Sequence, residues 1–191
     1  MTDSPMRVTF VSAARRWTGG ERCMVSVANG LARRGHDVNF AHDPRGPVGE
    51  RLAAEVRSYA IPIRNDVDFS ALMRLRNRIR EQNAEVVCVN AFRELKVGGL
   101  AARLAGAARV VSGRGANDVL SEGTRQRLLY RYLLDMVVRD SQAGCRRVRR
   151  ENPWFRRPIL QARSGVDANE LAAVELLPRM EIGAEDGELL I

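Results

Sequence analysis

Short runs of β-branched and apolar residues alternate with helix-forming segments along most of this 191-residue chain. The runs predict seven strands, at residues 6–12, 36–41, 58–63, 85–90, 108–112, 136–140 and 158–162. Because parallel strands need crossover connections, strands that alternate with helices are typical of an α/β fold. The run at residues 85–90 has a continuous apolar centre, as expected of a strand buried on both faces. We therefore predict a doubly wound parallel sheet of about seven strands.

The connecting helices are predicted from apolar residues that recur every three or four positions. The first helix runs from about Glu21 to Arg34 and is expected to end at Gly35, which tolerates a positive φ. Its apolar stripe includes Met24 and Val27. Further helices are expected at residues 46–56, 95–104, 125–134 and 142–150.

Two of these helices have clear N-terminal signals. Asp68 or Ser70 can cap one helix, whose apolar face is expected to include Phe69 and Leu72. Ser141 can cap the arginine-rich helix that ends near residue 150.

The junction between the first strand and the first helix contains Gly19, Gly20 and Glu21. Glycine permits close approach of the backbone, and the free N–H groups at a helix N-terminus favour an anion. The junction therefore reads as a phosphate-facing loop, although two glycines also occur in plain tight turns. It lacks the Gly-x-Gly-x-x-Gly fingerprint of dinucleotide-binding domains, and the chain has no P-loop motif.

The formal net charge is +8, and nearly all of the positively charged residues are arginine rather than lysine. Six arginines gather beside Trp154 and Phe155, namely Arg146, Arg147, Arg149, Arg150, Arg156 and Arg157. Such a patch suits an anionic membrane surface or an acidic substrate, and a solvated helix face is the alternative. Aromatic residues make up only 5% of the chain, so a base-stacking platform for nucleic acid is not indicated.

No segment has the roughly 18 apolar residues that a membrane-spanning helix needs, and the first residues lack a secretory signal pattern. We therefore expect a cytoplasmic protein. Its three cysteines, Cys23, Cys88 and Cys145, are widely separated and predict isolated thiols rather than disulfides. With only two histidines, a zinc site is not expected.

Residues 172–191 form an acidic, glycine-containing segment that ends in Leu189-Leu190-Ile191. An orphan apolar strand would expose its edge, so we expect this segment to be a linker and the start of a missing second domain. A frayed terminus is the other interpretation.

Five short motifs occur in a characteristic order, at residues 19–21, 35–38, 102–106, 135–141 and 164–167. Together they resemble the N-terminal domain of family-4 glycosyltransferases with the GT-B architecture. The resemblance covers about residues 6 to 171, so residues 1–171 are expected to be the acceptor-side domain. It implies a Rossmann-like fold that forms one half of a GT-B enzyme.

The resemblance further implies sugar transfer from a nucleotide-sugar to a saccharide or lipid-linked acceptor, with retention of anomeric configuration and no cofactor or divalent metal. It implies that Gly19, Gly20 and Glu21 face the donor diphosphate. Residues at the expected mouth of the sheet are the candidates for acceptor contacts: Asn90, Arg93, Glu94, Arg114 and Asp118. No catalytic residue is assigned.

The sequence departs from the family pattern at two positions. Arg114 stands where the family often has histidine; it cannot act as a general base, and either an anion or a salt bridge would suit it. Ser164 replaces an asparagine. The family's pair of donor-binding glutamates has no counterpart, so we expect the chain alone to be inactive. The alternative function is a noncatalytic module that binds an anion or a partner.

Overall fold

The computed structural model describes residues 4–90, 92–107, 109–113, 120, 123–163 and 165. Its seven strands are β1 (Arg7–Ser12), β2 (Asp37–His42), β3 (Arg57–Ala60), β4 (Val86–Val89), β5 (Arg109–Gly113), β6 (Met136–Arg139) and β7 (Ile159–Gln161). They form one parallel sheet in the order β3-β2-β1-β4-β5-β6-β7. The prediction of a Rossmann-like, doubly wound sheet is confirmed.

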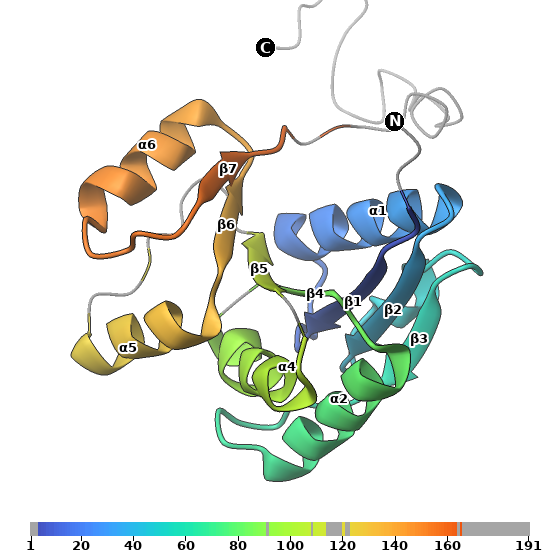
Figure 1. Ribbon diagram of the computed structural model, residues 1–191. Helices are drawn as coiled ribbons and strands as arrows, with labels where there is room; N and C mark the ends of the chain where they lie inside the picture. Colours follow the sequence, from blue (N-terminus) through green and yellow to red (C-terminus); the bar gives the residue numbers. More distant parts are fainter. Residues whose placement is uncertain are drawn as a thin grey trace, which may run out of the picture.

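Helices cover both faces of this sheet (Figure 1). The α-helices are α1 (Gly19–Arg33), α2 (Phe69–Gln82), α3 (Phe92–Glu94), α4 (Leu100–Ala105), α5 (Thr124–Leu133) and α6 (Gln142–Glu151). Two shorter turns are the 3-10 turn η1 (Gly49–Arg51) and the π-helical turn η2 (Leu95–Gly99). Helix α1 lies on one face, whereas α2, α4 and α5 lie on the other (Figure 1).

The strand order changes direction between β1 and β4. From β1 the chain first steps outward to β2 and β3, and then returns to place β4 on the other side of β1. In an open α/β sheet, ligands bind beyond the carboxyl ends of the strands at such a switch point. A ligand is therefore expected to bind at the loops that follow β1 and β4.

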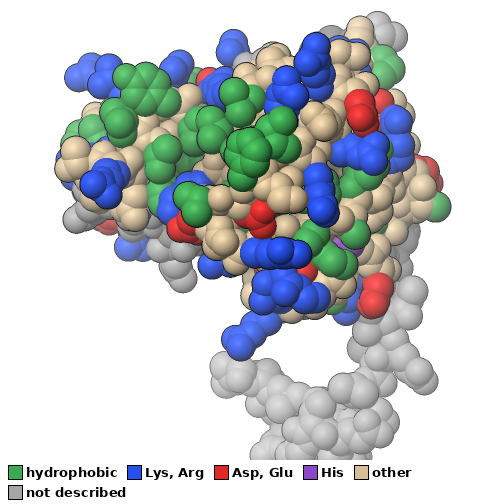
Figure 2. Space-filling view, turned by 90° about the horizontal axis from the view of Figure 1, so that it is seen from below, with side chains coloured by type: hydrophobic (Ala, Val, Ile, Leu, Met, Phe, Trp, Pro, Cys, Tyr) green, Lys and Arg blue, Asp and Glu red, His purple; other side chains and the backbone are tan. Residues whose placement is uncertain are grey.

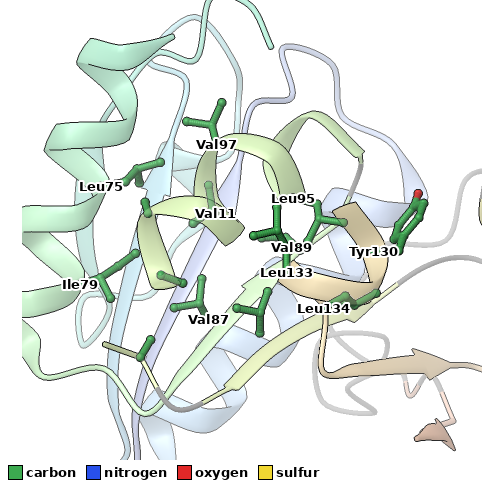
Figure 3. Close-up of a cluster of buried hydrophobic side chains, with 14 of the residues drawn as sticks. Val11, Leu75, Ile79, Val87, Val89, Leu95, Val97, Tyr130, Leu133 and Leu134 are labelled. Carbon is green, nitrogen blue, oxygen red and sulfur yellow. The ribbon is translucent and has the colours of Figure 1, made fainter. Parts of the chain in front are cut away.

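Two hydrophobic clusters hold the helices to the sheet. One packs α1 against β1 and β2 through Met24, Val25 and Phe40. The other joins the opposite face of the sheet to α2, η2, α5 and α6, and includes Leu75 and Leu133 (Figure 3). The switch point is thus fixed by packing on both of its faces.

The predicted ends of several helices are confirmed. Gly35 has φ of 85° just after α1, which suits its role as a helix stop. The Asp68 carboxylate accepts a hydrogen bond from the Ala71 N–H at 3.0 Å, and the Ser141 hydroxyl accepts one from the Gly144 N–H at 3.1 Å. Of the two proposed caps for α2, the structure selects Asp68.

Two predicted apolar stripes are partly wrong. Val27 is 47% exposed on α1, and Val25 is buried in its place. Phe69 is 71% exposed, although it is the first residue of α2. At about 100° per residue, Phe69 lies to one side of the stripe that Leu72 and Leu75 bury against the sheet.

The helix predicted at residues 46–56 is also wrong, because only the short turn η1 forms there. A Cβ at Gly46 would lie 2.2 Å from the Ala14 carbonyl oxygen, and one at Gly49 would lie 2.5 Å from the His42 ring. This segment follows the end of the sheet instead of coiling into a helix. The helix predicted at 95–104 begins earlier, at Phe92, and passes through η2 before α4.

Cys23 lies exposed on α1, whereas Cys145 is buried in α6, and neither forms a disulfide. Arg114, Asp118, Ser164 and residues 172–191 lie outside the described residues.

Candidate donor-phosphate and acceptor site

The loops that follow β1 and β4 meet at the carboxyl edge of the sheet, because these two strands are paired. The side chain of Asn90, just after β4, lies against the first turn of α1. A Cβ added to Gly20 would fall 2.5 Å from Asn90 Nδ2, a distance that real Cβ atoms essentially never show. At Gly19, by contrast, an added Cβ would meet no atom within 4 Å. A side chain at position 20 would therefore have to displace Asn90, whereas Gly19 leaves open space at the mouth of the sheet.

Glu21 is buried beneath this loop and holds two of its neighbours. Its Oε1 accepts a hydrogen bond from Asn90 Nδ2 at 3.2 Å, and its Oε2 accepts one from the Thr18 hydroxyl. The carboxylate thus ties the helix start to the end of β4. A negative charge in the first turn of a helix is also favoured by the helix dipole.

The N-terminal N–H groups of α1 are left available by this arrangement. Thr18 occupies the N-cap position, but its side chain donates to Glu21 and does not cap the helix. The first backbone hydrogen bond within the helix runs from the Arg22 N–H to the Thr18 carbonyl at 3.0 Å. The N–H groups of residues 19–21 precede that bond, so they can be offered to an anion at the mouth of the sheet.

Glu94 supports the same loop from the other side. It is buried, and its Oε1 accepts a hydrogen bond from the Ala13 N–H at 2.8 Å, directly after β1. Arg93 is exposed and forms an ion pair with Asp66 at 3.4 Å. Of the proposed acceptor residues, Asn90, Arg93 and Glu94 therefore follow one strand, with Arg93 on the surface and Glu94 within the wall.

The sequence did not predict a hollow that lies beside these residues. An open hollow of about 520 Å³ lies between α3 and the start of α5, lined by Phe92, Lys96, Gly123, Thr124, Arg125, Gln126 and Leu129. Lys96 Nζ lies 4.4 Å from the centre of the Phe92 ring and pairs with Asp66 at 2.5 Å. Phe92 comes three residues after the apolar strand β4, and this position is the signal that could have found the hollow.

The sequence also gave no sign of an ion cluster in which the buried Asp43 carboxylate pairs with two half-exposed arginines beside the loop between β1 and α1. Asp43 is fully buried after β2, and its Oδ2 accepts hydrogen bonds from Arg45 Nη2 at 2.8 Å and from Arg15 Nε at 3.1 Å. Hydrogen bonds from Arg45, with a further one from Arg15, hold the pKa of the Asp43 carboxyl well below its usual range. Arg15 belongs to the loop between β1 and α1, so this cluster attaches that loop to the end of β2.

A cation–π contact makes the same connection a second time. The Arg51 guanidinium of η1 lies 4.6 Å from the centre of the Trp17 ring. The stretch between β1 and α1 is thereby attached to the β2–β3 connection at both Arg15 and Trp17.

No group of three or more histidine, cysteine or acidic side chains in the part of the chain that the structure describes is arranged to hold a metal ion. Among the same residues, none of the helices has the length and apolar character needed to cross a bilayer.

Residues 17–167 match the model of Glycosyltransferase Family 4. The chain belongs to this family. The matched region begins two residues before Gly19 and contains every proposed site residue, so the resemblance inferred from the short motifs is confirmed. No curated protein sequence is significantly similar to this family 4 chain.

Solved structures show the same fold at low sequence identity. A glycosyltransferase from Rickettsia africae superposes with a TM-score of 0.71 at 15% identity, over 97% of this chain and 51% of that one. HepE from Anabaena, solved with UDP and glucose, gives a TM-score of 0.67 at 15% identity, over 93% and 50%. MurG from Acinetobacter baumannii gives 0.52 at 21% identity, over 71% and 41%. The family 4 chain thus spans about half the length of these proteins and has the fold of one half of a GT-B glycosyltransferase.

Proposed function

We propose that this chain is the acceptor-side domain of a retaining glycosyltransferase whose donor is a nucleotide-sugar. The observation that carries the proposal is the open N-terminus of α1 at Gly19, held in place by the contact of Asn90 with Gly20 and Glu21. The N–H groups there suit a diphosphate, on which negative charge grows as the bond between sugar and phosphate breaks. HepE, a protein of the same fold, is solved in complex with UDP-glucose, which supports a nucleotide-sugar donor.

The acceptor, a saccharide or a lipid-linked sugar, is proposed to enter at Asn90 and Arg93 and to extend toward the hollow beside Lys96. Glu94, Arg114 and Asp118 remain candidates for acceptor contacts. A second domain is proposed to supply the donor-binding half of the cleft, so that residues 1–171 alone are inactive. No cofactor or metal is proposed for the transfer step.

The arginine-rich surface around α6 is proposed to contact an anionic membrane from its cytoplasmic side. It consists of Arg146, Arg147, Arg149, Arg150, Arg156 and Arg157, which the structure leaves exposed. The last two also line a hollow of about 370 Å³ with Arg131, Trp154 and Phe155. Cations gathered in this way are attracted to anionic lipid head groups.

The deciding experiment is a titration of the full-length protein with a panel of nucleotide-sugars, followed by an assay for release of the nucleoside diphosphate. Binding of one nucleotide-sugar together with sugar transfer would support the proposal. Absence of both binding and transfer would refute it and favour a noncatalytic anion-binding module.

A further inference from the structure

A hollow of about 370 Å³ lies between α5 and the segment that joins α6 to β7. It is lined by Trp154 and Phe155 and by three arginines, Arg131, Arg156 and Arg157. Arg131 comes from the last turn of α5, and the other four residues come shortly before β7. We call this space the α5–β7 hollow. None of its lining residues is a candidate for donor or acceptor contacts.

The three arginines of the α5–β7 hollow differ from those of the neighbouring helix α6. Arg147 and Arg150 of α6 pair with Glu151 at 3.0 and 3.5 Å. Arg149 Nη2 donates a hydrogen bond to the Ile159 carbonyl oxygen at 3.1 Å. The arginines of the hollow form no ion pair or hydrogen bond with any residue of the chain. Three guanidinium groups without a protein partner therefore surround one concave space.

Packed aromatic rings form the wall of this hollow. Phe155 is buried, and its ring meets the Trp154 ring edge-on, with the ring centres 5.9 Å apart. The Trp154 ring also lies 6.2 Å from the ring of Tyr130, which is buried in α5. The Arg127 guanidinium lies 5.7 Å from the centre of the Trp154 ring. These contacts join the two segments that line the hollow, so ring packing fixes its shape.

The surroundings of the hollow are basic as well. Residues 124–134 and 152–163 contain no aspartate or glutamate, and their arginines are Arg125, Arg127, Arg131, Arg156, Arg157 and Arg163. Asp135 and Glu151, which flank these segments, already pair with arginines of α4 and α6. Figure 2 shows the molecule from below, the side of α4 and α5 in Figure 1, with many basic and fewer acidic side chains. An anion is therefore attracted by the whole region.

We propose that the α5–β7 hollow binds a small soluble ligand that carries a phosphate group. Guanidinium groups bind phosphate oxygens through paired N–H groups, and three of them suit the charge of a phosphate better than that of one carboxylate. The volume of the hollow is in the range of small-molecule sites. The Trp154 ring offers an apolar wall for the part of the ligand next to the phosphate.

Other occupants fit this hollow less well. A nucleic acid strand would need exposed aromatic faces for base stacking, but Phe155 is buried and Trp154 packs against two rings. An acidic peptide would bring single carboxylates, each of which answers one arginine. The inference goes beyond the proposed membrane contact around α6, because it depends on a concave site that Arg131 of α5 completes. It does not depend on sugar transfer.

The test is isothermal titration calorimetry of the full-length protein with phenyl phosphate and with inorganic phosphate, both of which are expected to bind. The double variant Arg131→Gln/Arg157→Gln removes two of the three guanidinium groups. Both side chains are exposed and unpaired, so the fold should not change. The affinity for phenyl phosphate is expected to fall about tenfold or more.

Two further variants serve as controls. Arg146→Gln/Arg147→Gln removes the same charge from exposed positions of α6 and should bind phenyl phosphate within about twofold of the wild type, because distant charges are screened by salt. Gly19→Ala, which is expected to obstruct the donor phosphate, should also keep this affinity. The outcomes for the hollow and for the proposed donor site are thereby distinguished.

Three results would each overturn the proposal: no binding of either phosphate by the wild type, unchanged binding by Arg131→Gln/Arg157→Gln, or an equal loss in Arg146→Gln/Arg147→Gln. Phosphatidylcholine vesicles that contain phosphatidic acid provide a last comparison. If such vesicles displace phenyl phosphate from the wild type, the phosphate belongs to a lipid head group and the assignment to a soluble ligand is wrong. Retention of phenyl phosphate in their presence would support it.

Discussion

Asn90 lies so close to Gly20 that a single added carbon would force its side chain to move: a Cβ there would be 2.5 Å from Asn90 Nδ2. This contact joins the end of β4 to the first turn of α1 at the switch point of the sheet. It also determines which substitutions at Gly20 the fold can accept.

Replacement of Gly20 by alanine is expected to lower the free energy of unfolding by about 1–2 kcal/mol. Alanine favours a helix over glycine by roughly 0.5–1 kcal/mol, but a displaced Asn90 loses its hydrogen bond to the Glu21 carboxylate, worth about 1.5–3 kcal/mol. Urea denaturation checks the value. In an Asn90→Ala background the same substitution should be stabilising, and a loss of equal size in both backgrounds would contradict the contact.

Gly19 is expected to behave in the opposite way. Gly19→Ala should raise the free energy of unfolding by up to about 1 kcal/mol, because its Cβ meets no atom. The same Cβ should obstruct a donor phosphate and raise KM for the nucleotide-sugar about tenfold in the full-length enzyme. Gly30→Ala is the matched control, since Gly30 lies in the same helix with open space around it. A normal KM in Gly19→Ala would count against the donor-phosphate assignment.

The pattern of strands and helices could be predicted because each element has its own apolar periodicity. All seven strands were found, within one or two residues at most ends, and the caps at Asp68 and Ser141 were read from local chemistry. The helix predicted at residues 46–56 failed because its glycines pack against Ala14 and the His42 ring. Contacts between segments that are distant in sequence leave no local signal of this kind.

In the candidate site, too, the residues with a local sequence signal were predicted and those held by distant contacts were missed. Gly20 and Asn90 were picked out because each ends or follows a recognisable element, and parallel pairing brought them together. Asp43 was missed because its partner Arg15 lies 28 residues away in the loop after β1, and a single Asp after a strand carries no pattern. The outward position of Phe69 was missed because the stripe of α2 is centred away from it.

Asp43→Asn is expected to destabilise the protein by about 2 kcal/mol at pH 7, because it weakens charged hydrogen bonds of a buried carboxylate. The lowered pKa of Asp43 means that its stabilising contribution is present above its unfolded pKa of about 4 and is lost as the pH falls toward the folded value. Urea denaturation between pH 7 and pH 3 should therefore show a shallower acid loss in Asp43→Asn than in the wild type. Asp66→Asn, on an exposed ion pair, should cause a smaller change, and an equal effect of the two substitutions would contradict the stabilising role of the Asp43 cluster.

Glu94 offers a way to separate support of the loop from contact with the acceptor. Glu94→Ala removes the acceptor of the Ala13 N–H bond and should lower the free energy of unfolding by about 1–3 kcal/mol. Glu94→Gln keeps an oxygen for that bond and should lose much less, so its kinetics report on the negative charge alone. If Glu94 also contacts the acceptor, KM for the acceptor should rise in Glu94→Gln while KM for the donor stays constant. Unchanged steady-state kinetics with near-normal stability would leave Glu94 as a support of the loop and remove it from the acceptor site.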